Sequence, residues 1–419
     1  MKVAKYNLTN PQKSIFLTEQ FYSGTTINNI CGHYIIHSNV NLNLLELAIN
    51  KVIENNDNLQ LHFTIENGIP LQFFSDYKYV NIDVLEVPDE SYLHNLEQDI
   101  FSKCFDVTSS NNLYEFKLFK FENNHGGFLL NFHHLLADSW GGGIICRQII
   151  ETYNFLVNNT DVIAPIPFLN KFSYLDFINS EHDYITSDKY VKDEQYWNNI
   201  FSTIPSTAIV PSKNCNTVGF LDCSAKRNTY YIPKDIMELI NSFCKQNKIS
   251  AYNFFMSIYA IYISKTSGIN DFVIGTPILN RTNFPQKNTS GMFVTTLPVR
   301  INLTKNTSFA EFAKNIAVQF VTMFRHQKYP YQNILENLRK SQPDLPNLYN
   351  TLISYQITKT NSTDSNCTTN WTFNNNCADN MQIHIMDLND SGSVTICYDY
   401  QTHKYSSIDI DNIHNRILN

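Results

Sequence analysis

Residues 128–143 read FLLNFHHLLADSWGGG, an apolar run followed by two histidines, an aspartate, a tryptophan and three glycines. The apolar run predicts a strand from Phe128 to His134, and the glycines predict a turn that opens a helix. Successive side chains of a strand point to opposite faces, so His133 and His134 should have different surroundings and different roles. Because metal ligands must converge on one point, the two rings together do not predict a metal site.

Asp138 follows the predicted strand and precedes Trp140 and the glycines. An aspartate in this position can accept backbone hydrogen bonds or pair with an arginine, so its expected role is to brace the turn. A single histidine on an apolar face is more often a satisfied structural residue than a reactive one. The combination of strand, paired histidines, aspartate, tryptophan and glycines is far more specific than any of its members, and it indicates a functional site.

The chain has 419 residues, a length that favours two packed units over one simple core. Strand and helix patterns are mixed throughout, which predicts the α/β or α+β class. The segment NNTDVIAPIPFLN, from Asn158, has weak periodicity and predicts a boundary between an N-terminal lobe at 1–165 and a C-terminal lobe at 166–419. A second connector, Thr358–Asn380, is rich in Asn, Ser and Thr. It is either a solvent loop or a segment that reaches across to the other lobe.

Local signals place several helices and strands. Ser250 is a suitable N-cap for an aromatic-rich helix that should end at Gly268, and Ser308 with Glu311 forms a capping-box pattern. The strand expected over Val394–Tyr400 alternates apolar and polar residues and should be half exposed. The other expected elements are a strand over Asp271–Pro277 and helices over Leu44–Asn55 and after Pro233.

Charge and composition argue against several classes of function. The net charge is -7 and no block of Lys and Arg is present, so nucleic acid is not an expected partner. No stretch approaches the roughly 20 apolar residues of a membrane span, and the first residues lack a signal-peptide segment, so a cytoplasmic protein without membrane contact is expected. Nine cysteines, none in CxxC spacing, predict free thiols.

HHLLADSW resembles the HHxxxDG signature of nonribosomal peptide synthetase condensation domains, part of the chloramphenicol acetyltransferase-like superfamily. Ser139 stands where the family usually has glycine, and Asn55 and Gln60 replace the two arginines of its RHExLR motif. Any salt bridge made by the second arginine is therefore missing. The other segments that resemble family motifs follow in the usual order and span essentially the whole chain: LTNPQKSIFLTEQFY, NNDNLQLHF, YLDF with Tyr196 and Trp197, NRTNFPQKNTSGMFVTTLPVR from Asn280, RHQKYPYQNIL from Arg325, and NLYNTLISYQ.

Two related kinds of domain share this signature. Epimerisation domains usually continue into SWRIL, and heterocyclisation domains replace the histidines with aspartates. This chain has GGGII after Trp140 and keeps both histidines, which favours condensation.

The resemblance implies two chloramphenicol acetyltransferase-like lobes, arranged as a V, with a central channel that carrier-bound substrates enter from opposite ends. It implies attack by the α-amine of an aminoacyl thioester on an acyl thioester. His134 would be the general base, or a group that orients the amine or stabilises the tetrahedral state. The residues expected to hold the site are His133, Asp138, Trp140 and Arg281, with Arg281 a candidate partner for Asp138. The candidate channel residues are Ser139, Gly141, Gly142, Gly291, Met292, Ser354 and Gln356.

The segments TEQFYSGTTINNI, NRTN, GMFV and RHQKYPY most resemble starter condensation domains of lipopeptide synthetases, which acylate the first amino acid with a fatty acid. Met1, close to the first motif, fits this N-terminal position. The final segment IDIDNIHNRILN has no cap, as expected of one domain cut from a longer synthetase. The implied partners are acyl-CoA or an acyl carrier protein as donor, a peptidyl carrier protein as acceptor and an adjacent adenylation domain, with no bound cofactor or metal.

Other functions remain open. The chain could be a peptidyl condensation domain with a carrier-bound aminoacyl or peptidyl donor, or a free-standing acyltransferase that uses a soluble amine or alcohol. It could also be a non-catalytic module that docks carrier proteins. The intact His133, His134 and Asp138 argue against the last of these.

Overall fold

The computed structural model divides into two compact units, each with its own β-structure and hydrophobic core. It describes residues 3–159, 166, 169, 172–212, 222–357, 366–387 and 392–418. Unit 1 consists of Met1–Ile185, Arg281–Val294 and Asn361–Asn374, and unit 2 consists of Thr186–Asn280, Thr295–Thr360 and Asn375–Asn419. The boundary expected at 165/166 falls within a segment that lies largely outside the described residues. The predicted lobes are contiguous, whereas each unit combines three segments of chain.

Unit 1 contains two sheets. Its strands are β1 (Tyr6–Asn7), β2 (Asn29–Ile36), β3 (Leu61–Glu66), β4 (Ile69–Phe74), β5 (Val84–Glu86), β6 (Tyr114–Lys120), β7 (Gly126–His133) and β12 (Cys367–Thr372). Its helices are α1 (Asn10–Phe21), α2 (Leu42–Asn55), α3 (Glu90–Phe101), α4 (Ser139–Asn158), α5 (Tyr174–Ile185) and α9 (Phe284–Lys287), with the 3-10 helix η1 (Asp57–Gln60). The larger sheet has the order β12-β2-β7-β6-β5, and the smaller one has the order β1-β4-β3.

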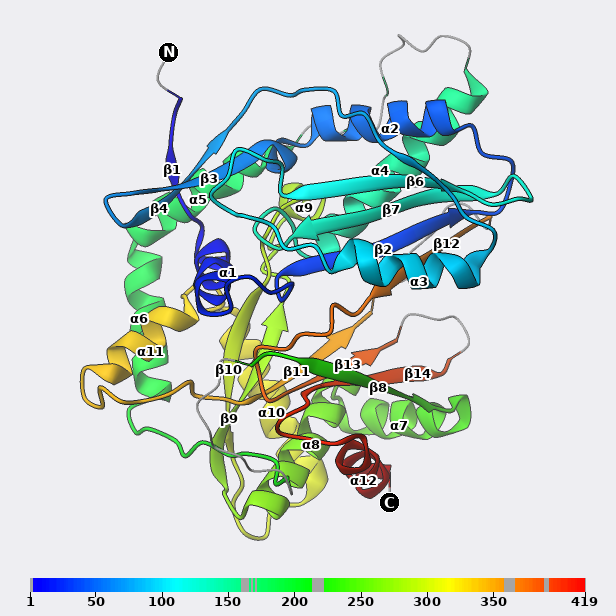
Figure 1. Cartoon of the computed structure of the whole chain (residues 1–419). Helices are drawn as coiled ribbons and strands as arrows, with labels where there is room; N and C mark the ends of the chain where they lie inside the picture. The colour runs from blue at the N-terminus through cyan, green and yellow to red at the C-terminus, as the bar shows by residue number, and fades with distance from the viewer. Residues whose placement is uncertain are drawn as a thin grey trace. The chain divides into compact units, whose positions relative to one another are not determined.

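The central strand β7 is covered on both faces (Figure 1). Ile49 of α2 and Ile145 of α4 pack in one core with Phe128 of β7. Leu93 of α3 packs with Leu129 of the same strand in a separate core on the other face. Every residue of β7 is buried, which explains why its sequence is an almost continuous apolar run. The strand ends at His133, one residue earlier than predicted.

Residues 367–372 of the second connector form β12, a strand of unit 1. β12 pairs antiparallel with β2, and Cys367 lies opposite Ile36. Figure 1 shows this orange strand beside β2, at the edge of the sheet. Between the two alternatives for this segment, a solvent loop is therefore wrong for residues 367–372.

Unit 2 is built on one six-stranded sheet. Its strands are β8 (Ala225–Ile232), β9 (Asp271–Ile278), β10 (Thr295–Asn302), β11 (Thr351–Gln356), β13 (Met381–Met386) and β14 (Val394–Gln401). Its helices are α6 (Asp188–Ile200), α7 (Lys234–Asn247), α8 (Ala251–Ser267), α10 (Phe309–Phe324), α11 (Tyr331–Arg339) and α12 (Ser407–Leu418). The sheet has the order β10-β9-β11-β13-β14-β8, with β11 parallel to both of its neighbours. Side chains of α8, α10 and α12 form its core with Ile383 and Tyr398.

The predicted helix ends of unit 2 are confirmed. The side chain of Ser250 accepts a hydrogen bond from the main chain of Asn253, and Gly268 ends the helix in the left-handed conformation at φ +75°. Ser308 likewise caps α10 by accepting from the main chain of Glu311 at 3.3 Å. These signals are local, so they do not depend on the rest of the fold.

The expectation that the strand over Val394–Tyr400 is half exposed is wrong. Cys397 and Asp399, on its polar face, are buried. Asp399 accepts hydrogen bonds of 2.6 and 2.7 Å from Arg227 on β8, and lies 3.2 Å from His384 on β13. The polar face can be buried because neighbouring strands supply partners for the charged side chain.

Candidate active site

The turn that follows β7 is fixed by amide side chains from two other elements of unit 1. Gln12 of α1 donates a hydrogen bond of 3.1 Å to the carbonyl of Leu135. Asn58 of η1 donates one of 3.0 Å to the carbonyl of Leu136. Both amide side chains are buried, so they satisfy backbone groups that water does not reach.

His133 is buried and both of its ring nitrogens have partners. Nε2 lies 3.2 Å from Oε2 of Glu19 on α1, and Nδ1 accepts the main-chain N–H of Leu135 at 3.1 Å. The ring stands edge-on to Phe105, with 6.3 Å between centroids. Burial acts to raise the pKa of Glu19, but hydrogen bonds from His133 and Asn28 lower it below its ordinary value. Glu19 is therefore a carboxylate at neutral pH.

His134 is half-buried, and its surroundings differ from those of His133. Its main-chain N–H donates to the carbonyl of Asn28 at 2.7 Å. In the part of the chain that the structure describes, its Nδ1 atom is buried without a hydrogen-bond partner. Burial lowers the pKa of His134 below that of an ordinary histidine, although the carboxylate of Asp138 acts in the opposite direction. The ring is therefore an uncharged base at neutral pH.

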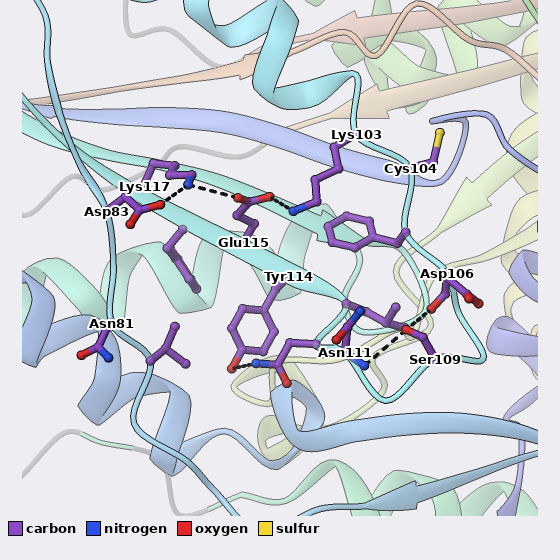
Figure 2. Close-up of a pocket in the computed structure, with 15 residues that line it drawn as sticks. Asn81, Asp83, Lys103, Cys104, Asp106, Ser109, Asn111, Tyr114, Glu115 and Lys117 are labelled. Atoms are coloured by element: carbon purple, nitrogen blue, oxygen red, sulfur yellow. Dashed lines mark hydrogen bonds and ion pairs between the residues drawn. The ribbon is translucent and has the colours of Figure 1, made fainter.

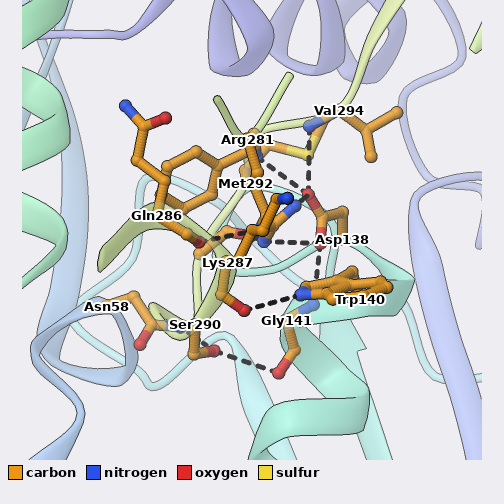
Figure 3. A network of polar contacts seen from close by, with 12 residues as sticks. Asn58, Asp138, Trp140, Gly141, Arg281, Gln286, Lys287, Ser290, Met292 and Val294 are labelled. Atoms are coloured by element: carbon orange, nitrogen blue, oxygen red, sulfur yellow. Dashed lines mark hydrogen bonds and ion pairs between the residues drawn. The ribbon is translucent and has the colours of Figure 1, made fainter. Parts of the chain in front are cut away.

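Asp138 lies at the centre of a buried polar network (Figure 3). Arg281 donates to both of its carboxylate oxygens, at 2.7 and 3.0 Å. The main-chain N–H groups of Gly141, Phe293 and Val294 donate at 2.8, 2.9 and 3.0 Å, and the first of these bonds caps α4. Burial acts to raise the pKa of Asp138, but the Arg281 guanidinium and these backbone groups lower it below its usual value.

Residues 281–294 lie against the turn after β7 and form hydrogen bonds with it (Figure 3). Trp140 donates from Nε1 to the carbonyl of Lys287 at 3.0 Å. Ser290 donates to the carbonyl of Gly141 at 3.2 Å and accepts from Asn58 at 3.1 Å. The turn after β7 and the segment 281–294 therefore form one hydrogen-bonded structure, although about 150 residues separate them in the sequence.

The backbone approaches too closely at two glycines for a side chain to fit. A β-carbon on Gly141 would lie 2.9 Å from the main-chain N and O of Gly291. Gly291 itself has φ +154°, and a β-carbon there would lie 2.2 Å from the ring of Tyr174. The hydroxyl of Tyr174 donates to the carbonyl of Met292 at 2.8 Å. Close packing within unit 1 thus accounts for both glycines.

The other candidate channel residues have varied surroundings. Ser139 is exposed at the start of α4, and a β-carbon on Gly142 would lie 3.1 Å from the ring of Trp371. Ser354 is buried on β11 of unit 2, with its hydroxyl 2.8 Å from Nδ1 of His384, and Gln356 is exposed at the end of the same strand. That these residues line a substrate channel stays a prediction.

The segment 55–60, which resembles the RHExLR motif, contains two residues whose hydrogen bonds the sequence did not predict. Asn58 holds the turn, as described above, and Asp57 accepts the main-chain N–H of Tyr174 at 2.9 Å. Gln60 donates to the carbonyl of Glu54, at the end of α2, at 3.1 Å. Asn55 is exposed. Gln60 therefore makes a local hydrogen bond where the family has its second arginine.

A polar cavity of about 460 Å³ lies beside β6 in unit 1 (Figure 2). Four of its charged side chains pair with one another. Nζ of Lys117 lies 2.5 Å from a carboxylate oxygen of Asp83 and 3.4 Å from one of Glu115, and Glu115 accepts from Nζ of Lys103 at 2.8 Å. Phe105 lines this cavity and also contacts the ring of His133. The cavity and the histidine turn therefore share a side chain.

Comparisons with known proteins identify the class and then the family. Solved condensation domains have the same chloramphenicol acetyltransferase-like fold. The family model described as "Condensation domain" matches residues 2–419, and the chain belongs to this family. Condensation domains form amide bonds in nonribosomal peptide synthetases, so the chain is an acyltransferase-type enzyme that needs no cofactor of its own.

Two curated relatives are bacterial peptide synthetases. Surfactin synthase subunit 1 from Bacillus subtilis (strain 168) is 32% identical over 426 residues, which cover 100% of this chain and 12% of that protein. Gramicidin S synthase 2 from Brevibacillus brevis is 26% identical over 336 residues, which cover 80% of this chain and 7% of that protein. The chain thus spans a small part of the length of these relatives.

Two solved structures share the fold over the whole chain. The starter condensation domain of rhizomide synthetase, in complex with C8-CoA, gives a TM-score of 0.84 at 19% identity and covers 99% of this chain and 93% of its own. The first condensation domain of the calcium-dependent antibiotic synthetase, in complex with a substrate analogue, gives 0.81 at 14% identity and covers 99% and 95%.

Within the described ranges, no helix has both the length and the apolar character that crossing a bilayer requires. The same residues contain no group of three or more His, Cys, Asp or Glu side chains that could hold a metal ion.

Proposed function

We propose that this chain is a starter condensation domain. It transfers a fatty acyl group from acyl-CoA or an acyl carrier protein to the α-amine of an aminoacyl thioester on a peptidyl carrier protein. An adjacent adenylation domain loads the acceptor. The structural likeness to a starter condensation domain in complex with C8-CoA supports this subtype.

The observation that carries the mechanism is the state of His134. Its imidazole is an uncharged base at neutral pH because burial lowers its pKa, and its main-chain N–H is tied to the carbonyl of Asn28. A base of this kind can take a proton from an amine that attacks a carbonyl carbon.

The reaction follows from these properties. The acceptor amine attacks the thioester carbonyl, so that a C–N bond forms and the carbonyl oxygen becomes an oxyanion. His134 takes one proton from the amine nitrogen. The carbonyl re-forms as the C–S bond breaks, and the departing thiolate receives the proton from His134. Atoms and charges balance without any further reactant.

His133, Asp138, Trp140 and Arg281 act by holding this centre in place. The second account of His134, in which it orients the amine or stabilises the tetrahedral state by a hydrogen bond, uses the same residues. Both accounts require the imidazole, and both predict a large loss of rate without it.

The test is mass spectrometry of an acceptor carrier protein loaded with an amino acid, incubated with the domain and a panel of acyl-CoAs. We expect N-acylation of the acceptor, reduced by about 100-fold or more in His134→Ala. Transfer only from a carrier-bound peptidyl donor would overturn the starter function and favour a peptidyl condensation domain. Acylation of a soluble amine or alcohol without a carrier would favour a free-standing acyltransferase. No transfer from any donor would favour a docking module.

A further inference from the structure

Glu19 is a buried carboxylate that the proposed reaction does not use. It lies on α1, and only 12% of its side chain is exposed. Its Oε2 atom accepts from the amide of Asn28 at 2.7 Å and faces Nε2 of His133 at 3.2 Å. Removing a carboxylate from water costs free energy unless the carboxylate accepts hydrogen bonds. These two contacts supply such bonds and hold Glu19 in its buried position.

The contacts of His133 determine where its proton lies. Its Nδ1 accepts the main-chain N–H of Leu135, so this nitrogen carries no hydrogen. Nε2 must therefore carry the ring proton and donate it to Glu19. One hydrogen bond on each side holds the ring in this tautomer. The orientation of the ring in turn fixes the main-chain N–H of Leu135, the residue that follows His134.

Asn28 connects this pair directly to His134. Its side chain donates to Glu19, and its main-chain carbonyl accepts the N–H of His134 at 2.7 Å. Asn28 is buried, as is Glu19. The main chain around His134 is thus held by two hydrogen bonds. The N–H of His134 donates to Asn28, and the N–H of the next residue, Leu135, donates to the ring of His133.

We propose that Glu19 and Asn28 are positioning residues of the condensation centre, which hold the imidazole of His134 through the side chain of His133 and the main chain of residues 133–135. Neither residue contacts the reacting atoms. The proposal rests on the role proposed for His134, and it assigns a purpose to the segment TEQFYSGTTINNI, which contains both residues.

Two substitutions at Glu19 separate hydrogen bonding from charge. In Glu19→Gln, the amide oxygen can take the place of Oε2 and accept from both His133 and Asn28, because one oxygen of the carboxylate makes both contacts. In Glu19→Ala, both contacts are lost. We expect kcat to fall at least about tenfold in Glu19→Ala, with KM for donor and acceptor nearly unchanged, and to stay within about threefold of the parent in Glu19→Gln.

Glu46→Ala is the matched control. Glu46 also lies on a helix of unit 1 and accepts one main-chain hydrogen bond, from Ile82 at 3.1 Å, but it does not contact the turn. Its loss should reduce thermal stability, by less than Glu19→Ala does, and should leave kcat unchanged.

A double substitution tests the route through the ring. In His133→Asn, the shorter side chain can still accept the N–H of Leu135 but cannot reach Glu19, so the protein should fold and kcat should fall, although less than in Glu19→Ala, which also releases Asn28. Because both changes break the contact between Glu19 and His133, the loss in the double variant should be smaller than the sum of the two single losses.

Three results would overturn the proposal: unchanged kcat in Glu19→Ala, an equal loss in Glu19→Gln, or full additivity with His133→Asn. A parallel assay of His134→Ala distinguishes this failure from failure of the proposed function. If His134→Ala is inactive and Glu19→Ala is fully active, only the positioning role is wrong. If His134→Ala is active, the role of His134 itself is wrong.

Discussion

Gly291 and Tyr174 meet so closely that the ring of Tyr174 occupies the space where a β-carbon of residue 291 would be. The tyrosine hydroxyl also bonds the carbonyl of Met292. This contact anchors the segment 281–294, which carries Arg281 to Asp138. The conformation of Gly291 is therefore part of what assembles the site.

Gly291→Ala should destabilise unit 1 and lower activity. The new β-carbon would lie 2.2 Å from Cδ2 of Tyr174, on a backbone at φ +154° that L-residues rarely adopt. We expect a loss of about 3 kcal/mol or more in the free energy of unfolding, measured by urea denaturation. Gly143→Ala is the control, since it lies in α4 with nothing within 4 Å of its β-carbon, and it should be neutral or slightly stabilising.

Arg281→Ala should destabilise the protein by about 3–5 kcal/mol, because it leaves the buried carboxylate of Asp138 without its counter-ion. Urea denaturation measures this loss. Lys51→Ala breaks an exposed pair with Glu54 at 3.5 Å and should cost less than about 1 kcal/mol. Equal losses in the two variants would contradict a special role for the buried pair.

Activity should persist at mildly acid pH. The pKa of His134 is lowered, so its imidazole stays uncharged below the ordinary histidine value of about 6.5. We expect the acid limb of the single-turnover rate to have its midpoint below that value, with an acceptor whose amine pKa is known and corrected for. A midpoint above it would show that burial does not control the protonation of this ring.

Asp138 should contribute to the loss of stability in acid. Its pKa is lowered in the folded state, so its stabilising effect is complete above the unfolded value of about 3.9 and is lost as the pH falls further. The midpoint of urea unfolding should therefore drop between pH 5 and pH 3, and the drop should be smaller in Asp138→Asn. Parallel curves for the two proteins would refute this assignment.

Asp379 in unit 2 should behave in the opposite way. Burial raises the pKa of its carboxyl to about 6, so the folded state holds this proton more tightly than the unfolded chain does. That contribution is present at low pH and is lost as the pH rises through about 6. Asp379→Asn, which can still accept from Gln382, should stabilise the protein by up to about 3 kcal/mol at pH 8 and by about half as much at pH 5. Urea denaturation at the two pH values is the measurement.

The sequence predicted features that depend on local chemistry. Ser250 and Gly268 bound α8 because a hydroxyl cap and a left-handed glycine act on their own helix. The family resemblance also implied Arg281 as a partner of Asp138, and the structure pairs them.

Partners distant in the sequence could not be predicted in this way. Glu19 and His133 are 114 residues apart, and no periodicity links a carboxylate on one helix to a histidine on a later strand. The prediction that β14 is half exposed failed for the same reason. Alternation shows which residues are polar, but it does not show that Arg227 and His384 surround Asp399.

Unit 1 is built from three separate segments of the chain, and this limits how the domain can be divided. A fragment ending at Ile185 would lack Arg281, and with it the counter-ion of Asp138, as well as the edge strand β12. Recombination or protein engineering that exchanges one half of this domain for that of a relative would therefore have to transfer three separate stretches of chain together. A single crossover near the middle of the sequence would instead combine Asp138 and β2 of one parent with the other parent's counterparts of Arg281 and β12, inside one packed unit.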